Sequence, residues 1–236
     1  MGNPTRFTAG VATVNAQEPL GNYPFPDPFH TGGSSTIGTF SYANDFNTLI
    51  GTDFTTTGTS STFALASGVG GIAVLTPGGT TTATATYKTA PFLQFQAGKQ
   101  FWYTCRFKAS AVSGTKSFYV GLRNGSSTTD GLWFAKAASS TSINLVSTVG
   151  STATTLVTGV ATAAADTYID VSFYFNGTDL LVYNNDALVA RVTAPTIGSS
   201  ATTLTDAILS PVFQITPTAT DTLTVDFVLA AQELTR

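Results

Sequence analysis

Residues 101–108 read Phe-Trp-Tyr-Thr-Cys-Arg-Phe-Lys, and this stretch decides the fold class of the chain. Its side chains alternate between an apolar set, Phe101, Tyr103, Cys105 and Phe107, and a mixed set, Trp102, Thr104, Arg106 and Lys108. Successive side chains of a β-strand point to opposite faces of the sheet, so a period of two predicts a strand with one buried face. We therefore assign the apolar set to a core and the mixed set to the outward face.

The same alternation recurs elsewhere in the chain. Residues 116–123 and 168–175 repeat it with Phe, Val, Leu and Ile on the inward face, and we predict that they neighbour residues 101–108 in one sheet. Further strands are predicted at residues 62–66, 71–75, 82–88, 132–136, 142–148, 154–160 and 222–229. Segments 180–183 and 188–192 flank Asn184-Asn185-Asp186, which tolerate positive φ, so these segments are predicted to form a hairpin.

Roughly a dozen such segments separated by polar turns, without helical periodicity, predict an all-β fold of two packed antiparallel sheets. A jelly roll satisfies this pattern. The order of the signals resembles the concanavalin-like family of lectins, glucanases and laminin-G modules: Asn44-Asp45-Phe46, Gly70-Gly71, the strand at 101–108, Phe-Tyr-Val-Gly-Leu at 118–122 and Asp-Leu-Leu-Val-Tyr at 179–183. The resemblance implies a jelly-roll sandwich over about residues 40–232.

The first 38 residues differ from the rest because they hold Pro4, Pro19, Pro24, Pro26 and Pro28. Proline fixes its own φ and biases the preceding residue toward extended conformations, so this segment is predicted to be a stiff extended arm. We accordingly divide the chain into an arm, residues 1–38, and a sandwich domain, residues 39–236. Apolar groups on an extended arm gain free energy only by docking, so we expect a subunit or partner interface at Phe7, Tyr23, Pro24, Phe25, Pro26, Pro28 and Phe29.

Composition limits the partners of the protein. Charged residues make up only 10% of the chain, the net charge is −3, and the ten Lys and Arg residues are scattered, which argues against a nucleic-acid surface. No apolar run approaches the roughly 18 residues that span a bilayer, so we expect no membrane segment. The single Cys105 cannot form an internal disulfide, and its place on the inward face predicts a neutral, unreactive thiol.

The residues that catalysis requires are scarce, and we expect no enzymatic activity and no cofactor. Glycoside hydrolysis needs two positioned carboxyl groups, yet the only glutamates are Glu18 in the arm and Glu233 near the end. Asp166 and Asp170 form the closest aspartate pair at the start of a predicted strand, where a solvated strand edge explains them better. The only histidine, His30, lies in the arm beside the prolines, where a contact or an exposed side chain is the simpler interpretation.

Metal sites have little support in the sequence. One His and one Cys do not make a zinc centre without clustered carboxylates, so no metal site is predicted. Calcium is the alternative that stays open, because Asn184, Asn185 and Asp186 offer oxygen ligands on one turn. A hairpin turn accounts for the same residues without an ion, and we favour it.

The outward face of the three aromatic strands is the predicted binding surface of the domain. It carries Trp102, Arg106, Tyr119, Arg123 and Tyr174, with Asp170 alongside. Aromatic rings bordered by hydrogen-bonding groups hold sugars and also anchor protein interfaces. The alternative is that a second sheet or a loop covers this face.

The N-terminus carries a second resemblance. Met-Gly-Asn-Pro-Thr-Arg-Phe-Thr at the start, Gly10-Val11, Pro-Leu-Gly-Asn-Tyr-Pro at 19–24 and Pro-Asp-Pro at 26–28 together resemble the start of tailed-bacteriophage structural proteins associated with capsid decoration. The resemblance implies a cement protein on the capsid surface of the virion, made in the cytoplasm of the bacterial host. Its arm would dock on the major capsid protein, and it would form a homo-oligomer, with a trimer as one form. The alternative function is a lectin-like adhesin that binds glycans at the virion or cell surface.

Overall fold

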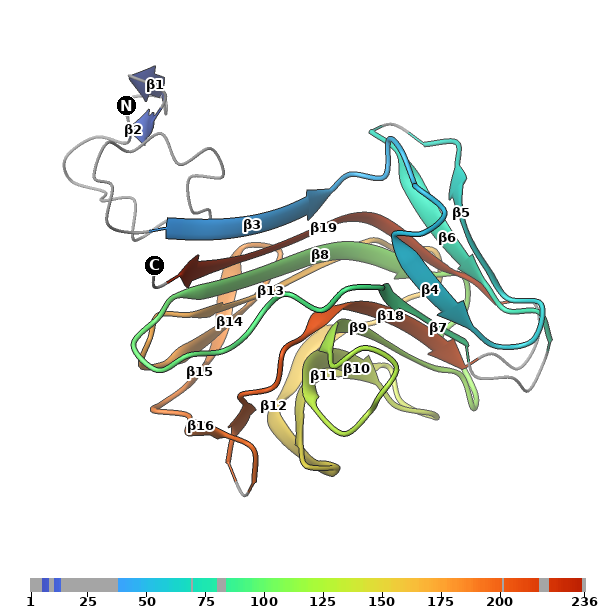
Figure 1. Cartoon of the computed structure of the whole chain (residues 1–236). Coiled ribbons are helices and arrows are strands. Elements are labelled where there is room, and N and C mark those ends of the chain that lie inside the picture. Colours follow the sequence, from blue (N-terminus) through green and yellow to red (C-terminus); the bar gives the residue numbers. More distant parts are fainter. Residues whose placement is uncertain are drawn as a thin grey trace.

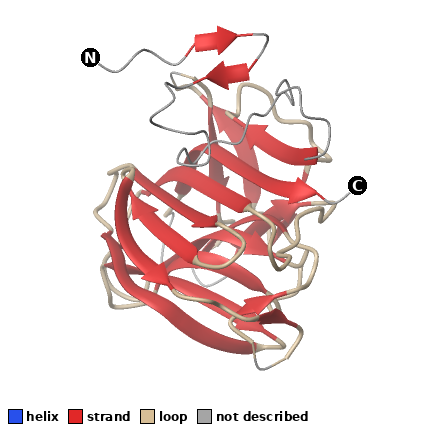
Figure 2. Cartoon of the chain, turned by 90° about the vertical axis from the view of Figure 1, so that its left-hand side faces the viewer, coloured by secondary structure: helices blue, strands red, loops and turns tan. Residues whose placement is uncertain are grey.

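The protein is all-β in the part that the computed structural model describes, which comprises residues 6–8, 11–13, 38–68, 70–79, 84–200, 202–216 and 221–234. Two large sheets face each other as the layers of a sandwich (Figure 1). Figure 2 shows strands joined by loops and no helix among the described residues. No helix capable of spanning a membrane is found in these ranges. The predicted all-β, two-sheet antiparallel architecture is confirmed.

The eight-stranded sheet contains the strand that decided the fold class. In spatial order its strands are β15 (Ala187–Val192), β14 (Leu180–Asn184), β13 (Ile169–Phe175), β8 (Phe101–Ala109), β19 (Leu223–Leu234), β6 (Ile72–Thr76) and β5 (Thr62–Ala66), and β3 (Gly38–Asn44) also pairs with β19. Every pairing in it is antiparallel. Gly38 lies opposite Leu234, so the start of β3 and the end of β19 are side by side (Figure 1).

The seven-stranded sheet forms the other layer. Its order is β12 (Thr152–Thr162), β11 (Ser142–Val149), β10 (Gly131–Lys136), β9 (Ser117–Arg123), β18 (Ser210–Thr216), β7 (Thr84–Lys88) and β4 (Phe54–Thr57), again antiparallel throughout. Two small pairs complete the described strands: β1 (Arg6–Thr8) with β2 (Val11–Thr13), and β16 (Ile197–Gly198) with β17 (Leu204–Thr205).

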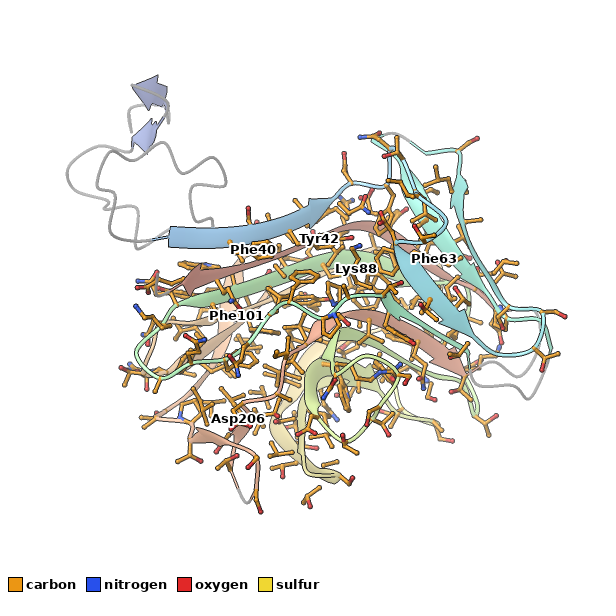
Figure 3. All side chains as sticks on the ribbon, in the orientation of Figure 1. Phe40, Tyr42, Phe63, Lys88, Phe101 and Asp206 are labelled. Carbon is orange, nitrogen blue, oxygen red and sulfur yellow. The ribbon has the colours of Figure 1, made fainter. Side chains whose placement is uncertain are left out.

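The core lies between the two sheets, where side chains fill the space (Figure 3). Phe173 on β13 is fully buried, and its ring lies 5.2 Å from that of Tyr103, 6.0 Å from that of Phe101 and 6.1 Å from that of Phe134 on the opposite sheet. Such ring contacts add to the free energy gained from burying apolar area. The alternation of residues 101–108 therefore identified the buried face correctly.

The prediction that residues 101–108, 116–123 and 168–175 are neighbours in one sheet is wrong for one of the three. β8 and β13 do pair, but β9 belongs to the seven-stranded sheet. The apolar faces of β8 and β9 meet across the core, where the rings of Phe107 and Phe118 make an edge contact at 5.6 Å. The sequence of a strand shows that one of its faces is buried. It does not show whether two such strands lie side by side in one sheet or face each other from opposite sheets.

One hairpin was predicted correctly, and three strands of the two large sheets were missed. The hairpin at Asn184-Asn185-Asp186 is confirmed, with positive φ at Asn185 (47°) and Asp186 (62°). Strands β3, β4 and β18 were not predicted. The segment of β18 contains Pro211, a residue that argues against a central strand, yet Pro211 stands near its beginning, where a missing N–H is tolerated.

The arm aromatic and proline residues Tyr23, Pro24, Phe25, Pro26, Pro28 and Phe29 lie outside the described residues, and Phe7 is described only as part of the backbone of β1. The interface prediction for the arm therefore stays a prediction. The strand that follows the arm packs against the domain: Tyr42 of β3 contacts the ring of Phe92 at 5.5 Å, and Lys88 lies 5.9 Å from the Tyr42 ring centre (Figure 3).

Candidate functional site

The five residues predicted to share one outward face lie on two opposite faces of the sandwich. Trp102, Arg106 and Tyr174 are on the outer face of the eight-stranded sheet, whereas Tyr119 and Arg123 are on the outer face of the seven-stranded sheet. The prediction of a single aromatic platform is wrong, because it rested on placing β9 beside β8. The two faces differ in how open their aromatic rings are.

On the eight-stranded sheet, Trp102 and Tyr174 cover each other. They are direct cross-strand partners, and their rings stack with centroids 4.1 Å apart and planes 18° apart. Trp102 is 6% exposed and Tyr174 9%, and they pack with Leu229 and Ala231 of β19. Burial raises the pKa of Tyr174 to about 12. This group, which we call the Trp102 cluster, has no open ring face for a sugar.

Next to the Trp102 cluster, Arg106 is neutralised by aspartates. Its Nε lies 3.3 Å from a carboxylate oxygen of Asp226 and 3.7 Å from one of Asp170, and its guanidinium lies 4.9 Å from the ring centre of Tyr168. Burial raises the pKa of Asp170, while Arg106 opposes that shift. Arg106 is paired with carboxylates of the protein itself, so this part of the predicted surface offers no free cation.

The outer face of the seven-stranded sheet carries a different group. The register places Tyr119 opposite Gln214 of β18, and it aligns Trp133, Gly121, Val212 and Tyr87 in one row across β10, β9, β18 and β7. Arg123 lies on the same face, two residues beyond Gly121 along β9. We call Tyr87, Tyr119, Arg123, Trp133 and Gln214 the Tyr119 site.

Two glycines allow close packing around Trp133. A Cβ on Gly121 would come within 2.5 Å of the Leu132 carbonyl oxygen, and a Cβ on Gly131 within 2.4 Å of the Trp133 ring. The other side of the indole stacks on Tyr119, with centroids 5.1 Å apart and planes 26° apart. Trp133 is only 8% exposed, and its stacking holds one face of the Tyr119 ring in place.

Arg123 is the second support. It is 2% exposed, its Nη1 donates to the Tyr119 hydroxyl at 2.5 Å, and its Nε donates to the Gly125 carbonyl at 2.9 Å. The guanidinium also lies 5.6 Å from the ring centre of Tyr87. Burial raises the pKa of Tyr119, and the neighbouring Arg123 opposes that shift.

Tyr87, Tyr119 and Gln214 form the partly exposed layer above these supports. Tyr119 donates to Gln214 Oε1 at 2.6 Å, and Arg123 Nη1 approaches the same oxygen at 3.5 Å. Because Oε1 accepts both contacts, the Nε2 end of the amide remains available as a donor. The site thus offers ring surface and an oriented donor, which are the groups that hold sugars.

Carboxylates are absent from the described strands around the Tyr119 site. The seven strands of the sheet that carries the Tyr119 site contain neither Asp nor Glu. No group of three or more His, Cys, Asp or Glu side chains within the described ranges is arranged to hold a metal ion. Cys105 is fully buried, and burial raises the pKa of its thiol, as expected for an unreactive side chain.

Tyr87, Trp133 and Gln214 were missed by reasoning from sequence. Segments 82–88 and 132–136 were recognised as strands, and the inward Leu132 and Phe134 could have assigned Trp133 to the outer face. Gln214 lies on β18, which was not predicted at all. No sequence signal brings these residues together, because they come from strands far apart in the chain.

No protein-family model and no curated protein matches the sequence. Solved structures match in fold. A protein of unknown function from Shewanella oneidensis MR-1 has 12% identity and a TM-score of 0.59, over 85% of this chain and 89% of that one. The endo-1,3-beta-glucanase from Streptomyces sioyaensis has 11% identity and a TM-score of 0.56, over 86% and 98%. Peanut lectin has 8% identity and a TM-score of 0.54, over 84% and 100%. The chain therefore has the antiparallel jelly-roll fold that this glucanase and this lectin share.

Proposed function

We propose that this protein binds carbohydrate without hydrolysing it, and that sugars bind at the Tyr119 site. The observation that carries the proposal is the partly exposed layer of Tyr87, Tyr119 and Gln214, held in place by Trp133 and Arg123. Aromatic rings contact the apolar faces of sugar rings, and oriented amides and hydroxyls bond to sugar hydroxyls. The same fold occurs in peanut lectin.

The absence of carboxylates from the strands of the seven-stranded sheet supports binding rather than hydrolysis. Hydrolysis of a glycoside uses a pair of carboxyl groups on either side of the scissile bond. Asp130, which precedes β10, is engaged elsewhere: it accepts hydrogen bonds from Thr129, Thr205 and the backbone of Gly150. The strands around Tyr119 thus lack the acid and base that a glycosidase would need.

The test is a screen of the purified protein against a broad panel of polysaccharides and oligosaccharides, followed by affinity measurements on Tyr87→Ala. We expect binding without release of reducing ends, and about tenfold weaker binding by the variant. Tyr183→Ala is the matched control, because Tyr183 is a partly buried tyrosine beside the Trp102 cluster on the opposite face. A screen without any bound glycan, or equal losses in both variants, would contradict the proposal.

Capsid decoration is a second candidate function, and the N-terminal resemblance to tailed-phage structural proteins favours it. In this proposal the chain is a virion protein on the capsid surface, its arm binds the major capsid protein, and it assembles as a homo-oligomer such as a trimer. The point where the arm joins the domain supports this arrangement. Gly38 lies opposite Leu234 at one end of β3, so the arm meets the domain at an end of the sandwich.

This second function has its own experiment. Purified particles are examined by mass spectrometry for the chain, and the full chain is compared with a variant lacking residues 1–38 for binding to empty capsids. We expect the truncated protein to fold, as measured by its thermal unfolding, and to lose capsid binding. Unchanged binding by the truncated protein would contradict the role of the arm in capsid binding. Absence of the chain from purified particles would contradict capsid decoration itself.

A further inference from the structure

Arg123 is a buried cation whose partners are all neutral. Its hydrogen bonds go to a carbonyl oxygen, a phenol oxygen and an amide oxygen, on Gly125, Tyr119 and Gln214. Among the side chains that the structure describes, no carboxylate lies within ion-pair distance of it. By contrast, Arg106 and Arg191 both pair with aspartate.

The surrounding sheet supplies no anion either. Its strands hold the cations Lys88, Arg123 and Lys136 and neither Asp nor Glu, although the whole chain has a net charge of −3. Lys88 pairs with Asp53, and Lys136 donates to the carbonyl oxygens of Lys116 and Ala137. In the strand register Lys88 and Lys136 lie opposite the core residues Phe54 and Phe118, so they are on the inner face of the sheet. Among the described strands of this sheet, Arg123 is therefore the cation of the outer face that has no carboxylate partner.

A buried charge without a counterion is unfavourable, and it interacts strongly with any opposite charge that enters the same low-dielectric region. The partly exposed layer above Arg123 consists of Tyr87, Tyr119 and Gln214, so an anion in contact with this layer would lie close to the guanidinium. The described contacts of the Gln214 amide with Tyr119 and Arg123 both use Oε1, so Nε2 can donate to that anion. A neutral sugar would gain the ring contacts but not the charge interaction.

We propose, building on the carbohydrate-binding function above, that the Tyr119 site selects sugars that carry an anionic group, either the carboxylate of a hexuronic acid or a sulfate ester. The anionic group accepts a hydrogen bond from Gln214 Nε2, and Arg123 supplies the positive charge behind it. The rings of Tyr87 and Tyr119 contact the sugar ring. Arg123 thus acts as a specificity residue that supports the contact layer without being exposed itself.

The experiment compares ligands that differ only in charge. Affinities of the wild-type protein are measured for hexuronate oligosaccharides, for the same oligosaccharides with methyl-esterified carboxylates, and for sulfated and unsulfated forms of one polysaccharide. We expect the anionic member of a pair to bind about tenfold more tightly, with the difference shrinking at high salt. The pair that shows the difference identifies carboxylate or sulfate as the group recognised.

Gln214→Glu tests the role of Arg123 without removing it. The new carboxylate has nearly the same shape, can still accept from Tyr119, and provides Arg123 with a counterion inside the protein. We expect this variant to lose the preference for the anionic member, and its affinity for the neutral member to fall as well, because the Nε2 donor of Gln214 is gone. Gln96→Glu, the same change in the loop before β8, is the control for net charge and should keep the preference.

The possible outcomes distinguish a failure of the anionic preference from a failure of carbohydrate binding. Equal binding of the charged and neutral members by the wild-type protein overturns the anionic preference and leaves carbohydrate binding intact. A preference that survives in Gln214→Glu overturns the role of Arg123. Binding of no glycan of either kind contradicts the proposed function itself, and the anionic preference falls with it. The ligand pairs test the anionic preference on the wild-type protein, so that test stands even if the variant unfolds.

Discussion

The hydroxyl of Tyr119 donates a hydrogen bond of 2.6 Å to Gln214 Oε1, across the pairing of β9 with β18. The same hydroxyl accepts from Arg123, so one oxygen atom links the buried cation to the amide that faces outward. This arrangement fixes the direction of the Gln214 amide. Without the hydroxyl, neither Arg123 Nη1 nor Gln214 Oε1 would keep its short hydrogen bond.

Tyr119→Phe should therefore affect both stability and binding. The ring and its stacking on Trp133 remain, but a partly buried hydrogen bond that involves a charged donor is lost. We expect the free energy of unfolding to fall by about 1 to 2 kcal/mol, measured by urea denaturation. Sugar binding should weaken as well, because the amide is no longer oriented. A variant with lower stability but wild-type affinity would show that the hydroxyl has only a structural role.

Phe173→Ala should strongly destabilise the sandwich. Phe173 is fully buried and contacts aromatic rings of both sheets, so its removal leaves a cavity that the surroundings cannot fill easily. The expected loss is about 3 to 5 kcal/mol in the free energy of unfolding. Leu188→Ala is the control, since Leu188 is 58% exposed, and its expected effect is within about 0.5 kcal/mol. Similar losses for the two variants would mean that the core is not centred where the structure places it.

Stability should decrease in acid, with a contribution from Asp179. A hydrogen bond from the backbone of Ala194 and an ion pair with Arg191 hold the pKa of Asp179 below its usual value. Burial of Asp130 favours a higher pKa, but hydrogen bonds from Thr205, Gly150 and Thr129 outweigh it and lower the pKa. A carboxyl group with a lowered folded-state pKa stabilises the protein above its unfolded-state pKa of about 3.9, and this stabilisation is lost as the pH falls through the folded-state value.

The measurement is the urea midpoint of the wild-type protein and Asp179→Asn between about pH 7 and about pH 2. We expect the variant to be less stable at neutral pH and to lose less stability on acidification. Asp166→Asn removes one negative charge at a side chain that is 70% exposed, and it serves as the control. Parallel pH profiles for the wild-type protein and Asp179→Asn would contradict the assignment.

Cys105 should be unreactive while the protein is folded. The side chain is fully buried and its thiol pKa is raised, so little thiolate forms and reagents cannot reach it. Because it is the only cysteine, modification can be followed unambiguously. We expect a thiol reagent to label the chain only in denaturant or at the rate of unfolding. Rapid labelling of the native protein would show that β8 is not in the core.

The sequence determined the type of the main elements because the signals for them are local. Alternating side chains at 101–108 identified β8 and its buried face, and Asn184-Asn185-Asp186 identified a hairpin turn with positive φ. The sequence did not reveal β18, because Pro211 weakened the strand signal of that segment. The shortage of Glu and His was likewise visible in the sequence.

Only the tertiary structure decided which surface carries the candidate binding site. Periodicity reports that one face of a strand is buried, but strand pairing depends on contacts between segments far apart in the chain. Trp102 and Tyr119 therefore looked equivalent in sequence, whereas they lie on opposite faces of the sandwich. Pairing of β9 with β10 and β18 brought Tyr119, Trp133 and Gln214 together. It also left Arg123 buried among neutral partners, a circumstance that no stretch of the sequence records.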